Sequence, residues 1–268
     1  MTYFEAIILG LVQGLAEFLP ISSSGHLALI KHFFHLSQNS NLSFEIFLHL
    51  GSLLAVIIFF RCMIWKLIKS LVFFRDSQLQ AERLMCFWLF LATLVTVIIG
   101  IFCKDIIEDS FANPFFVTTM IAITGLIVFI SDKISDSTQF KSNKLNWKKA
   151  LLIGLGQSLA MTPGISRSGT TIAVSLFVGL KRSQVIAFSF LLSIPIILGA
   201  NISEIKTFLQ LDWNQLSVYL VGFIMAFISG YLVFNWLTKL VAKAKLRYFA
   251  YYCWTVSFLA FFLIILGF

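Results

Sequence analysis

The sequence predicts an all-α polytopic membrane protein with six transmembrane helices and two re-entrant helical hairpins in an inverted-topology repeat. Two observations lead to this prediction. First, 59% of the 268 residues are hydrophobic and only 12% are charged, and the mean hydropathy of +0.93 is far above that of soluble domains. Second, residues 6–26 recur at 150–170, with ten of the 21 positions identical and no gap. Repeated polar turns within apolar sequence are typical of membrane proteins built from repeats.

Six apolar stretches are long enough, or nearly so, to cross a bilayer, which takes about 20 helical residues. They cover residues 43–61, 84–103, 115–131, 184–201, 215–237 and 248–267. No part of the sequence resembles a soluble domain, a long linker or a low-complexity tract. We therefore expect a single integral membrane domain over 1–268, with internal repeats at about 1–131 and 145–268.

Two shorter apolar segments, 4–19 and 148–162, are each followed by a proline and a Ser-X-Ser-Gly turn. We interpret each segment as the first arm of a re-entrant hairpin whose second arm starts after the turn. Irregular backbone at membrane depth is tolerated only where protein or a wet cavity surrounds it. Three predicted spans separate the hairpins, so the second hairpin is inverted and the two turns are expected to converge near mid-membrane.

The basic residues predict the orientation of the chain. Sixteen of the 20 lysines and arginines cluster in four regions, which are 61–83, 132–149, 181–182 and 239–247. The remaining loops, 104–114 and 202–214, contain one lysine each and more acidic residues than basic ones. The positive-inside rule makes the first set cytoplasmic and places both termini outside. The net charge of +8 is thus a topology signal that favours contact with anionic membrane lipids, and we expect no nucleic-acid partner.

The first turn contains side chains suited to phosphoryl chemistry. Gln13 and Glu17 are four residues apart and so share one face of a helix. Ser23 and His26 are three residues apart at the start of the next helix, and a serine within reach of a histidine can act as a nucleophile with its base. Glu17 together with Gln13 also suggests a divalent ion between carboxylate and phosphate oxygens.

Both turns open a helix N-terminus, whose free N–H groups and dipole favour an anion. The second turn adds Arg167, flanked by small hydroxyl residues, and the arginine fork matches the geometry of a phosphate. The expected substrate-binding residues are Arg167, Ser22, Ser24, Ser166, Ser168 and Thr170. Together the two turns predict phosphoryl chemistry on a substrate that is reached from within the membrane.

Each of these side chains also has a structural interpretation. Arg167 can pair with Glu17, the Ser-X-Ser-Gly turns can serve as helix caps, and His26 can be a cap or an interfacial residue. A buried charge is expensive in a membrane and usually functional, so we prefer the functional interpretation for Arg167. Farther along, Glu45 and His49 share one face of a predicted span, where a pocket-lining role and a structural hydrogen bond are equally supported.

Two motifs give the chain a resemblance to a known family. The segments EFLPISSSGH at 17–26 and PGISRSGTT at 163–171 resemble those of the undecaprenyl-pyrophosphate phosphatases, also called bacitracin-resistance proteins, and the resemblance covers essentially the whole chain. It implies an undecaprenyl-diphosphate phosphatase, which converts the C55 lipid diphosphate to the monophosphate and inorganic phosphate and so recycles the carrier of cell-wall synthesis. It also implies a multi-pass protein of the bacterial cytoplasmic (inner) membrane whose active site opens to the outer side.

The resemblance further implies residue roles and partners. Ser23, His26 and Glu17 would be catalytic, and Glu17 and Gln13 would hold a divalent cation, Mg²⁺ or Ca²⁺. Bacitracin would compete for the polyprenyl diphosphate lipid, and a homodimer is left open. Many members of the family have Glu at the position of Gln13 and others have Gln, so the affinity and number of metal ions are left open too. The nucleophile is Ser23, His26 or water.

The main alternative is a transporter or flippase for a phosphate-bearing lipid. Inverted repeats with broken helices also form transporters, and a fold by itself does not decide function. The set of Ser23, His26 and Glu17 argues for an enzyme, because transport needs a binding arginine but no nucleophile and no base. A third alternative, a non-catalytic assembly factor, predicts no convergent polar cluster.

Overall fold

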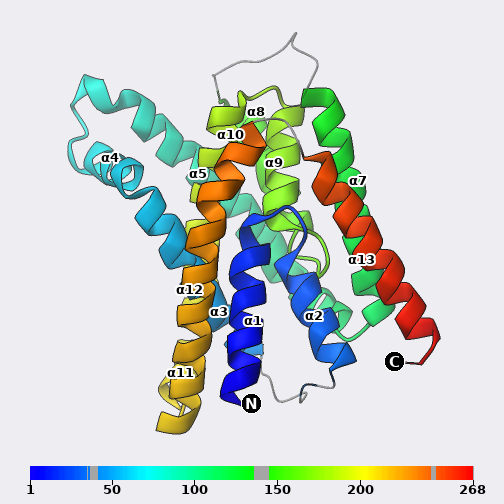
Figure 1. Ribbon diagram of the computed structural model, residues 1–268. Helices are drawn as coiled ribbons and strands as arrows, with labels where there is room; N and C mark the ends of the chain where they lie inside the picture. Colours follow the sequence, from blue (N-terminus) through cyan, green and yellow to red (C-terminus); the bar gives the residue numbers. More distant parts are fainter. Residues whose placement is uncertain (35, 37–41, 136–144, 243–245, 268) are drawn as a thin grey trace.

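The computed structural model describes residues 1–34, 36, 42–135, 145–242 and 246–267, which form helices and the turns between them (Figure 1). Six of the described helices are long and apolar enough to cross a membrane. These six are α3 (Leu42–Phe59), α5 (Gln80–Phe102), α7 (Pro114–Ser135), α10 (Arg182–Ser203), α12 (Trp213–Ala242) and α13 (Arg247–Ile265). They coincide with the six predicted stretches, which confirms an all-α, multi-pass membrane protein. Four of the lysines behind the predicted orientation, Lys141, Lys144, Lys243 and Lys245, lie outside the described residues.

Four shorter helices form two helix–turn–helix pairs. The first pair is α1 (Tyr3–Phe18) with α2 (Ser23–Phe33), and the second is α8 (Trp147–Leu159) with α9 (Arg167–Phe177). The first turn begins where it does because Pro20 disfavours helical geometry at the residue before it, and Leu19 is indeed extended. In Figure 1 the first pair lies in the lower half of the molecule and the second in the upper half, with both turns near mid-height.

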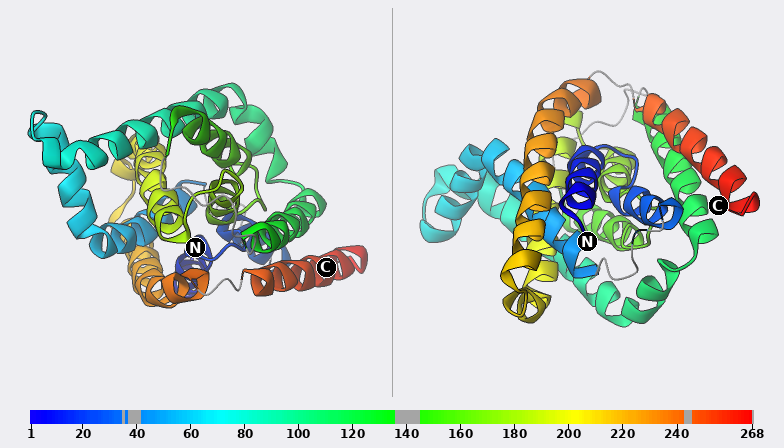
Figure 2. Two further views of the ribbon diagram at one scale, coloured as in Figure 1. Left: turned by 90° about the horizontal axis from the view of Figure 1, so that it is seen from above. Right: turned by 60° about the horizontal axis from the view of Figure 1, so that its bottom comes forward.

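The two turns touch one another. The Ser168 hydroxyl donates to the carbonyl oxygen of Leu19 at 3.0 Å. A Cβ atom on Gly25 would fall 2.9 Å from the Cα atom of Gly164, so the absence of a side chain at Gly25 allows this approach. Two views of the molecule show the longer helices around both pairs (Figure 2), which keeps the turns inside the protein.

Matching glycines pack the first helix of each pair against a long helix. A Cβ atom on Gly10 would lie 2.4 Å from the carbonyl oxygen of Gly222 in α12, and one on Gly154 would lie 2.7 Å from that of Ala92 in α5. Gly10 and Gly154 occupy equivalent positions of the repeated segment. Small residues that let backbones approach closely are the usual means of packing helices in membranes.

Buried aromatic rings hold the end of α1 in place. Phe18 is fully buried and meets the rings of Phe190 and Phe234 edge-on, with centroids 5.7 Å and 4.9 Å away. Because Phe18 directly follows Glu17, this packing holds the backbone from which the Glu17 side chain extends.

The remaining elements lie at the ends of the long helices. They are α4 (Arg61–Val72), the short 3₁₀ helix η1 (Ser77–Leu79), α6 (Lys104–Ser110) and α11 (Ile205–Leu209). The α4 helix and the start of α5 project to one side of the body (Figure 1). The α6 helix contributes to the site, because it lines the cavity described below.

Candidate active site

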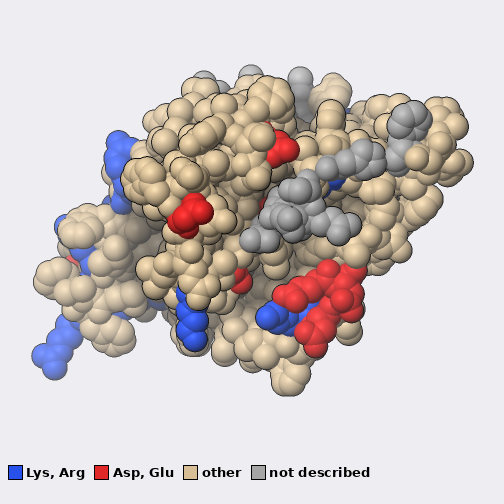
Figure 3. All heavy atoms as spheres, turned by 90° about the horizontal axis from the view of Figure 1, so that it is seen from below, with Lys and Arg blue, Asp and Glu red and all other residues tan. Residues whose placement is uncertain are grey.

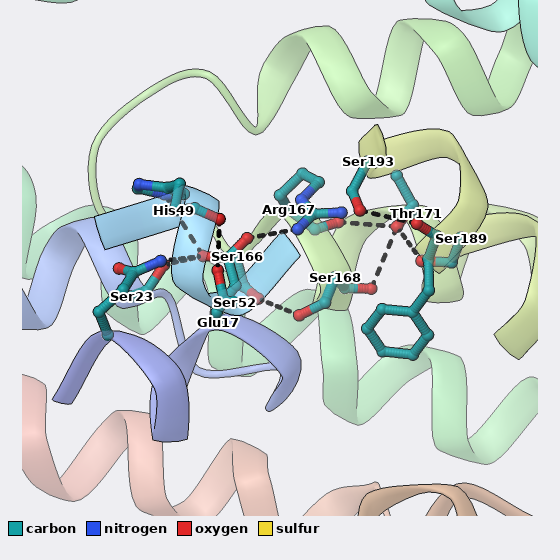
Figure 4. A network of polar contacts seen from close by, with 12 residues as sticks. Glu17, Ser23, His49, Ser52, Ser166, Arg167, Ser168, Thr171, Ser189 and Ser193 are labelled. Atoms are coloured by element: carbon teal, nitrogen blue, oxygen red, sulfur yellow. Dashed lines mark hydrogen bonds and ion pairs between the residues drawn. The ribbon is translucent and has the colours of Figure 1, made fainter. Parts of the chain in front are cut away.

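Glu17 is the centre of the polar cluster between the two turns (Figure 4). Its Oε2 atom accepts hydrogen bonds from the Ser23 hydroxyl at 2.7 Å and from the Gln13 amide nitrogen at 2.9 Å. Its Oε1 atom forms an ion pair with Arg167, and the Nε2 atom of His49 lies 3.4 Å from Oε2. A carboxylate that is 95% buried (5% exposed) requires such partners, since an unpaired charge in an apolar interior is very costly.

Backbone strain in the first turn aims Ser23 at Glu17. Ser22, the N-cap of α2, has φ 72° and ψ 95°, and among the described residues it is the one non-glycine with positive φ. Its hydroxyl accepts a hydrogen bond from the backbone N–H of Gly25 at 3.2 Å. A left-handed serine is a strained conformation of the kind that collects at functional sites. The reversal at Ser22 brings the hydroxyl of Ser23 back to the helix that carries Glu17.

The second turn is anchored on α7. Gly164 has φ +92°, and a Cβ atom there would fall 2.4 Å from the carbonyl oxygen of Val117. The Thr124 hydroxyl donates to the carbonyl oxygen of Gly164 at 2.8 Å and accepts from the N–H of Ser166 at 2.9 Å. Ser166 caps α9 by accepting from the N–H of Gly169 at 3.0 Å. Arg167 is therefore the first residue of a rigidly held helix, with its side chain 15% exposed.

The structure does not bring Ser23 and His26 together as a hydrogen-bonded pair, which corrects the expectation from their spacing. The Nδ1 atom of His26 lies 2.7 Å from the carbonyl oxygen of Ser22, and Nε2 lies 3.0 Å from the hydroxyl of Tyr252. The imidazole also stacks on the Tyr252 ring, with centroids 5.6 Å apart and an interplanar angle of 9°. His26 is four residues after Ser22, so its ring reaches the carbonyl one helical turn back, while Ser23 donates to Glu17.

A cavity of about 400 Å³ adjoins this cluster. Glu17, Ser23, Ser24, Ser166 and Arg167 all line it. Three other predicted binding residues are buried and do not line it: Ser22 caps α2, Ser168 bonds to Leu19, and the Thr170 hydroxyl is buried without a partner among the described residues. The predicted anion-binding residues are thus divided between the wall of the cavity and the scaffold that shapes it.

The cavity extends from the two turns to α6. Lys104 and Glu108 of that helix line it, and the exposed residues of α6 include Asp105 and Asp109. Figure 3, seen from below, shows acidic side chains gathered on this lower face. The face where the cavity meets α6 is therefore the acidic one, and the sequence predicts that it is the outer side.

Several residues that line the cavity were not predicted from the sequence as site residues. They are Thr96, Gln157, Asn201 and Lys104, whereas Glu45 and His49, for which the sequence left a pocket-lining role open, also line the cavity. Gln157 is the repeat counterpart of Gln13, and that correspondence is a signal that was available in the sequence. Its amide nitrogen donates to the Thr96 hydroxyl at 3.1 Å, and its Oε1 atom is buried without a partner in the described part of the chain.

The side chain of Gln13 is the observation that bears on a metal ion. Its amide nitrogen donates to Glu17, which leaves Oε1 buried without a donor among the residues described. Mg²⁺ and Ca²⁺ prefer oxygen ligands, so Gln13 and Glu17 fit part of a cation site. Within the described ranges, no group of three or more His, Cys, Asp or Glu side chains is placed to hold a metal ion. Further ligands would have to be water or substrate oxygens.

Comparison with known proteins gives a consistent result. Residues 6–259 match the family described as bacitracin resistance protein BacA. The chain is 39% identical over 273 residues to an undecaprenyl-diphosphatase of Methanobrevibacter smithii, with 97% of each chain covered. It is 39% identical to undecaprenyl-diphosphatase 1 of Shouchella clausii, covering 97% and 96% of the two chains, and 41% identical to an undecaprenyl-diphosphatase of Methanosphaera stadtmanae, covering 93% of each.

Proposed function

The chain belongs to the bacitracin resistance protein BacA family, and on this premise we propose that it hydrolyses undecaprenyl diphosphate to undecaprenyl phosphate and inorganic phosphate. Relatives of nearly equal length are named for this activity. The observation that supports it best within the structure is the cluster of Ser23, Glu17 and Arg167 on one cavity wall. A pure transporter is not favoured, because it has no use for a serine hydroxyl bonded to a carboxylate.

The diphosphate would be held by Arg167 and the two helix N-termini. Arg167 uses Nη2 to pair with Glu17, while its Nη1 atom is buried without a partner among the described residues. A phosphate oxygen would satisfy that nitrogen with a charge-assisted hydrogen bond. The hydroxyls of Ser24 and Ser166, which line the cavity at the starts of α2 and α9, lie where helix ends favour an anion.

Glu17 is the natural base for Ser23. As the Ser23 oxygen bonds to the terminal phosphorus, its proton passes to Glu17 Oε2, to which it already donates at 2.7 Å. The bond from that phosphorus to the bridging oxygen breaks, and undecaprenyl phosphate leaves with the electron pair. Water then attacks the phosphoserine. Ser23 recovers its proton from Glu17, and both protons of the water remain on the released phosphate.

Direct attack by water, with Glu17 as base, fits the same cluster. The two routes differ in the covalent intermediate, so rapid quenching and mass spectrometry of the peptide around Ser23 separate them. His26 is the weaker candidate for base or nucleophile, since both of its ring nitrogens have partners. We assign His26 to holding the first turn through Ser22 and Tyr252.

We also propose that a divalent cation, Mg²⁺ or Ca²⁺, takes part. Glu17 and the free Oε1 atom of Gln13 are the protein groups that would hold it, and the ion would neutralise charge on the diphosphate oxygens. Gln13 carries no charge, so the ion should bind weakly in the absence of substrate. Chelation should abolish phosphate release, and addition of Mg²⁺ or Ca²⁺ separately should show which ion restores it.

For the membrane arrangement, we propose that the two short-helix pairs are re-entrant hairpins of opposite topology in a cytoplasmic membrane. Each helix in these pairs has 16 residues or fewer, whereas a span takes about 20. The cavity would open outward, because α6 lies in a loop that the positive-inside rule assigns to the outside. The partners would be the polyprenyl diphosphate and membrane lipids, with bacitracin competing for the former; the homodimer that the resemblance left open is not part of this proposal.

Phosphate release from C55 diphosphate by the purified protein in detergent tests this function. Wild type should release phosphate, and Ser23→Ala and Glu17→Gln should release very little. Ser70→Ala is a matched control, because Ser70 is also buried but bonds to its own helix at Leu67 and does not line the cavity. Absence of release by wild type, or equal release by all four proteins, would contradict the proposal.

A further inference from the structure

His49 approaches the Glu17 carboxylate from a helix outside the two turns. It lies on α3 and lines the cavity together with Glu17 and Ser23, and its side chain is 25% exposed. Figure 4 shows its imidazole directed at the Glu17 carboxylate, where Nε2 is 3.4 Å from Oε2. The proposed mechanism gives this histidine no role, although it contacts the same oxygen atom that receives the Ser23 hydrogen bond.

The other side of the imidazole is held by α3 itself. Nδ1 lies 2.7 Å from the carbonyl oxygen of Glu45, one turn earlier. Carbonyl and carboxylate oxygens only accept, so Nδ1 donates to Glu45 and Nε2 donates to Glu17 from an imidazolium ring, whose plane is set by the first of these contacts. The carboxylate of Glu45 forms an ion pair with Lys31 of α2, which ties this turn of α3 to the helix that begins at Ser23.

From these contacts we infer that His49 is a positioning residue for Glu17 in the phosphatase reaction. This inference rests on the proposed function. Arg167 is paired with Oε1, but it would also bind the diphosphate. Its contact with Glu17 would therefore change when substrate binds. The contact from His49 does not involve the substrate-binding arginine, and it keeps Oε2 aligned with the Ser23 hydroxyl throughout the reaction.

His26 cannot replace His49 in this role. Its imidazole is directed at Ser22 and Tyr252, and it is not among the residues that line the cavity. His26 therefore contacts the first turn, while His49 joins Gln13 in contacting Oε2 of the carboxylate. A displacement of a reacting group by about 1 Å can reduce a rate by about 100-fold, so loss of this support should be measurable.

Two amide substitutions separate positioning from simple structural support. In His49→Gln the amide nitrogen can reach the place of Nε2, whereas in His49→Asn it reaches only the place of Nδ1. Both side chains are neutral and polar, so any general effect on the folding of α3 should be similar. We expect kcat of His49→Gln to stay within about threefold of wild type and kcat of His49→Asn to fall by at least about tenfold. KM should change by less than about twofold in both, because Arg167 and the helix ends still bind the diphosphate.

Each outcome of this comparison is decisive. If wild type releases no phosphate, the proposed function fails and the inference falls with it. If wild type is active and His49→Asn retains its kcat, only the inference is overturned. An equal loss in both variants would point to chemistry specific to imidazole, and a rise in KM with unchanged kcat would point to substrate binding; either result contradicts a positioning role. Thermal unfolding midpoints of both variants should match, which excludes misfolding as the cause of a difference.

Discussion

Arg167, the first residue of α9, forms an ion pair with Glu17, near the end of α1, although 150 residues separate them. The contact lies where the two turns touch, next to the hydrogen bond from Ser168 to Leu19. Arg167 therefore joins the halves of the chain through Nη2, while Nη1 is buried without a partner in the described part of the protein. The structural and the phosphate-binding interpretations of this arginine apply to different nitrogens of one side chain.

Arg167→Lys should lower kcat/KM by at least about tenfold, which corresponds to about 1.4 kcal/mol. Lysine retains the charge but offers a single ammonium group, so it cannot hold Glu17 with one nitrogen and a phosphate oxygen with another. Steady-state phosphate release over a range of substrate concentrations measures the effect. Near wild-type turnover in Arg167→Lys, together with an active Arg167→Ala, would refute the assignment of Arg167 to the diphosphate.

Ser23 and Glu17 should act as one unit. Ser23→Ala and Glu17→Gln should each lower kcat/KM by at least about 100-fold, and the double variant should be little worse than either, since both remove the same proton transfer. Their spacing along the chain predicted Ser23 and His26 as the nucleophile and its base. In the structure the hydrogen bond of Ser23, at 2.7 Å, is to Glu17 instead.

The comparison with His26 provides the control for that cycle. His26→Ala should loosen the first turn through loss of its contacts with Ser22 and Tyr252, so its effect should multiply with that of Ser23→Ala. If instead the effects of His26→Ala and Ser23→Ala fail to multiply while those of Glu17→Gln and Ser23→Ala do, His26 is the base and the role given to Glu17 is wrong.

Gly14→Ala should destabilise the protein by about 1–3 kcal/mol, because overpacking forces the backbone to move. A Cβ atom at Gly14 would lie 2.1 Å from the Ser229 hydroxyl and 2.3 Å from the carbonyl oxygen of Ala226. Gly199→Ala is the matched control, since a Cβ atom there meets nothing within 4 Å. Thermal unfolding in detergent should show a lower midpoint than wild type for Gly14→Ala but not for Gly199→Ala. Equal midpoints for the two variants would mean that α1 and α12 leave room for a methyl group at Gly14.

The orientation can be measured with single cysteines in a variant that lacks the four native ones. Arg75 and Asp109 are both exposed and lie in loops on opposite sides of the predicted topology. A membrane-impermeant thiol reagent should label Asp109→Cys in intact cells and Arg75→Cys only after the membrane is opened, as the positive-inside rule requires. The reverse pattern would place the cavity mouth at α6 on the cytoplasmic side.

The spans and the turns were predictable from sequence because the signals behind them are local. Length and hydropathy suffice for a transmembrane helix, and the six stretches coincide with the six long apolar helices. Ser22 and Ser166 cap α2 and α9, as expected of a serine that precedes a helix. The repeat also identified the two turns that carry Glu17, Ser23 and Arg167, because ten identical positions are visible without any structure.

Hydropathy and the repeat were thus enough to predict the spans and the turns that carry the polar groups. Which of those groups meet depends on the packing of the helices. Spacing along the chain pairs Ser23 with His26, but the left-handed backbone of Ser22 turns the serine toward Glu17 and places the ring of His26 against Ser22 and Tyr252. His49 reaches Glu17 through the packing of α3 beside α1. The direction of a side chain depends on backbone dihedral angles and on contacts between distant helices, and neither is encoded in residue spacing.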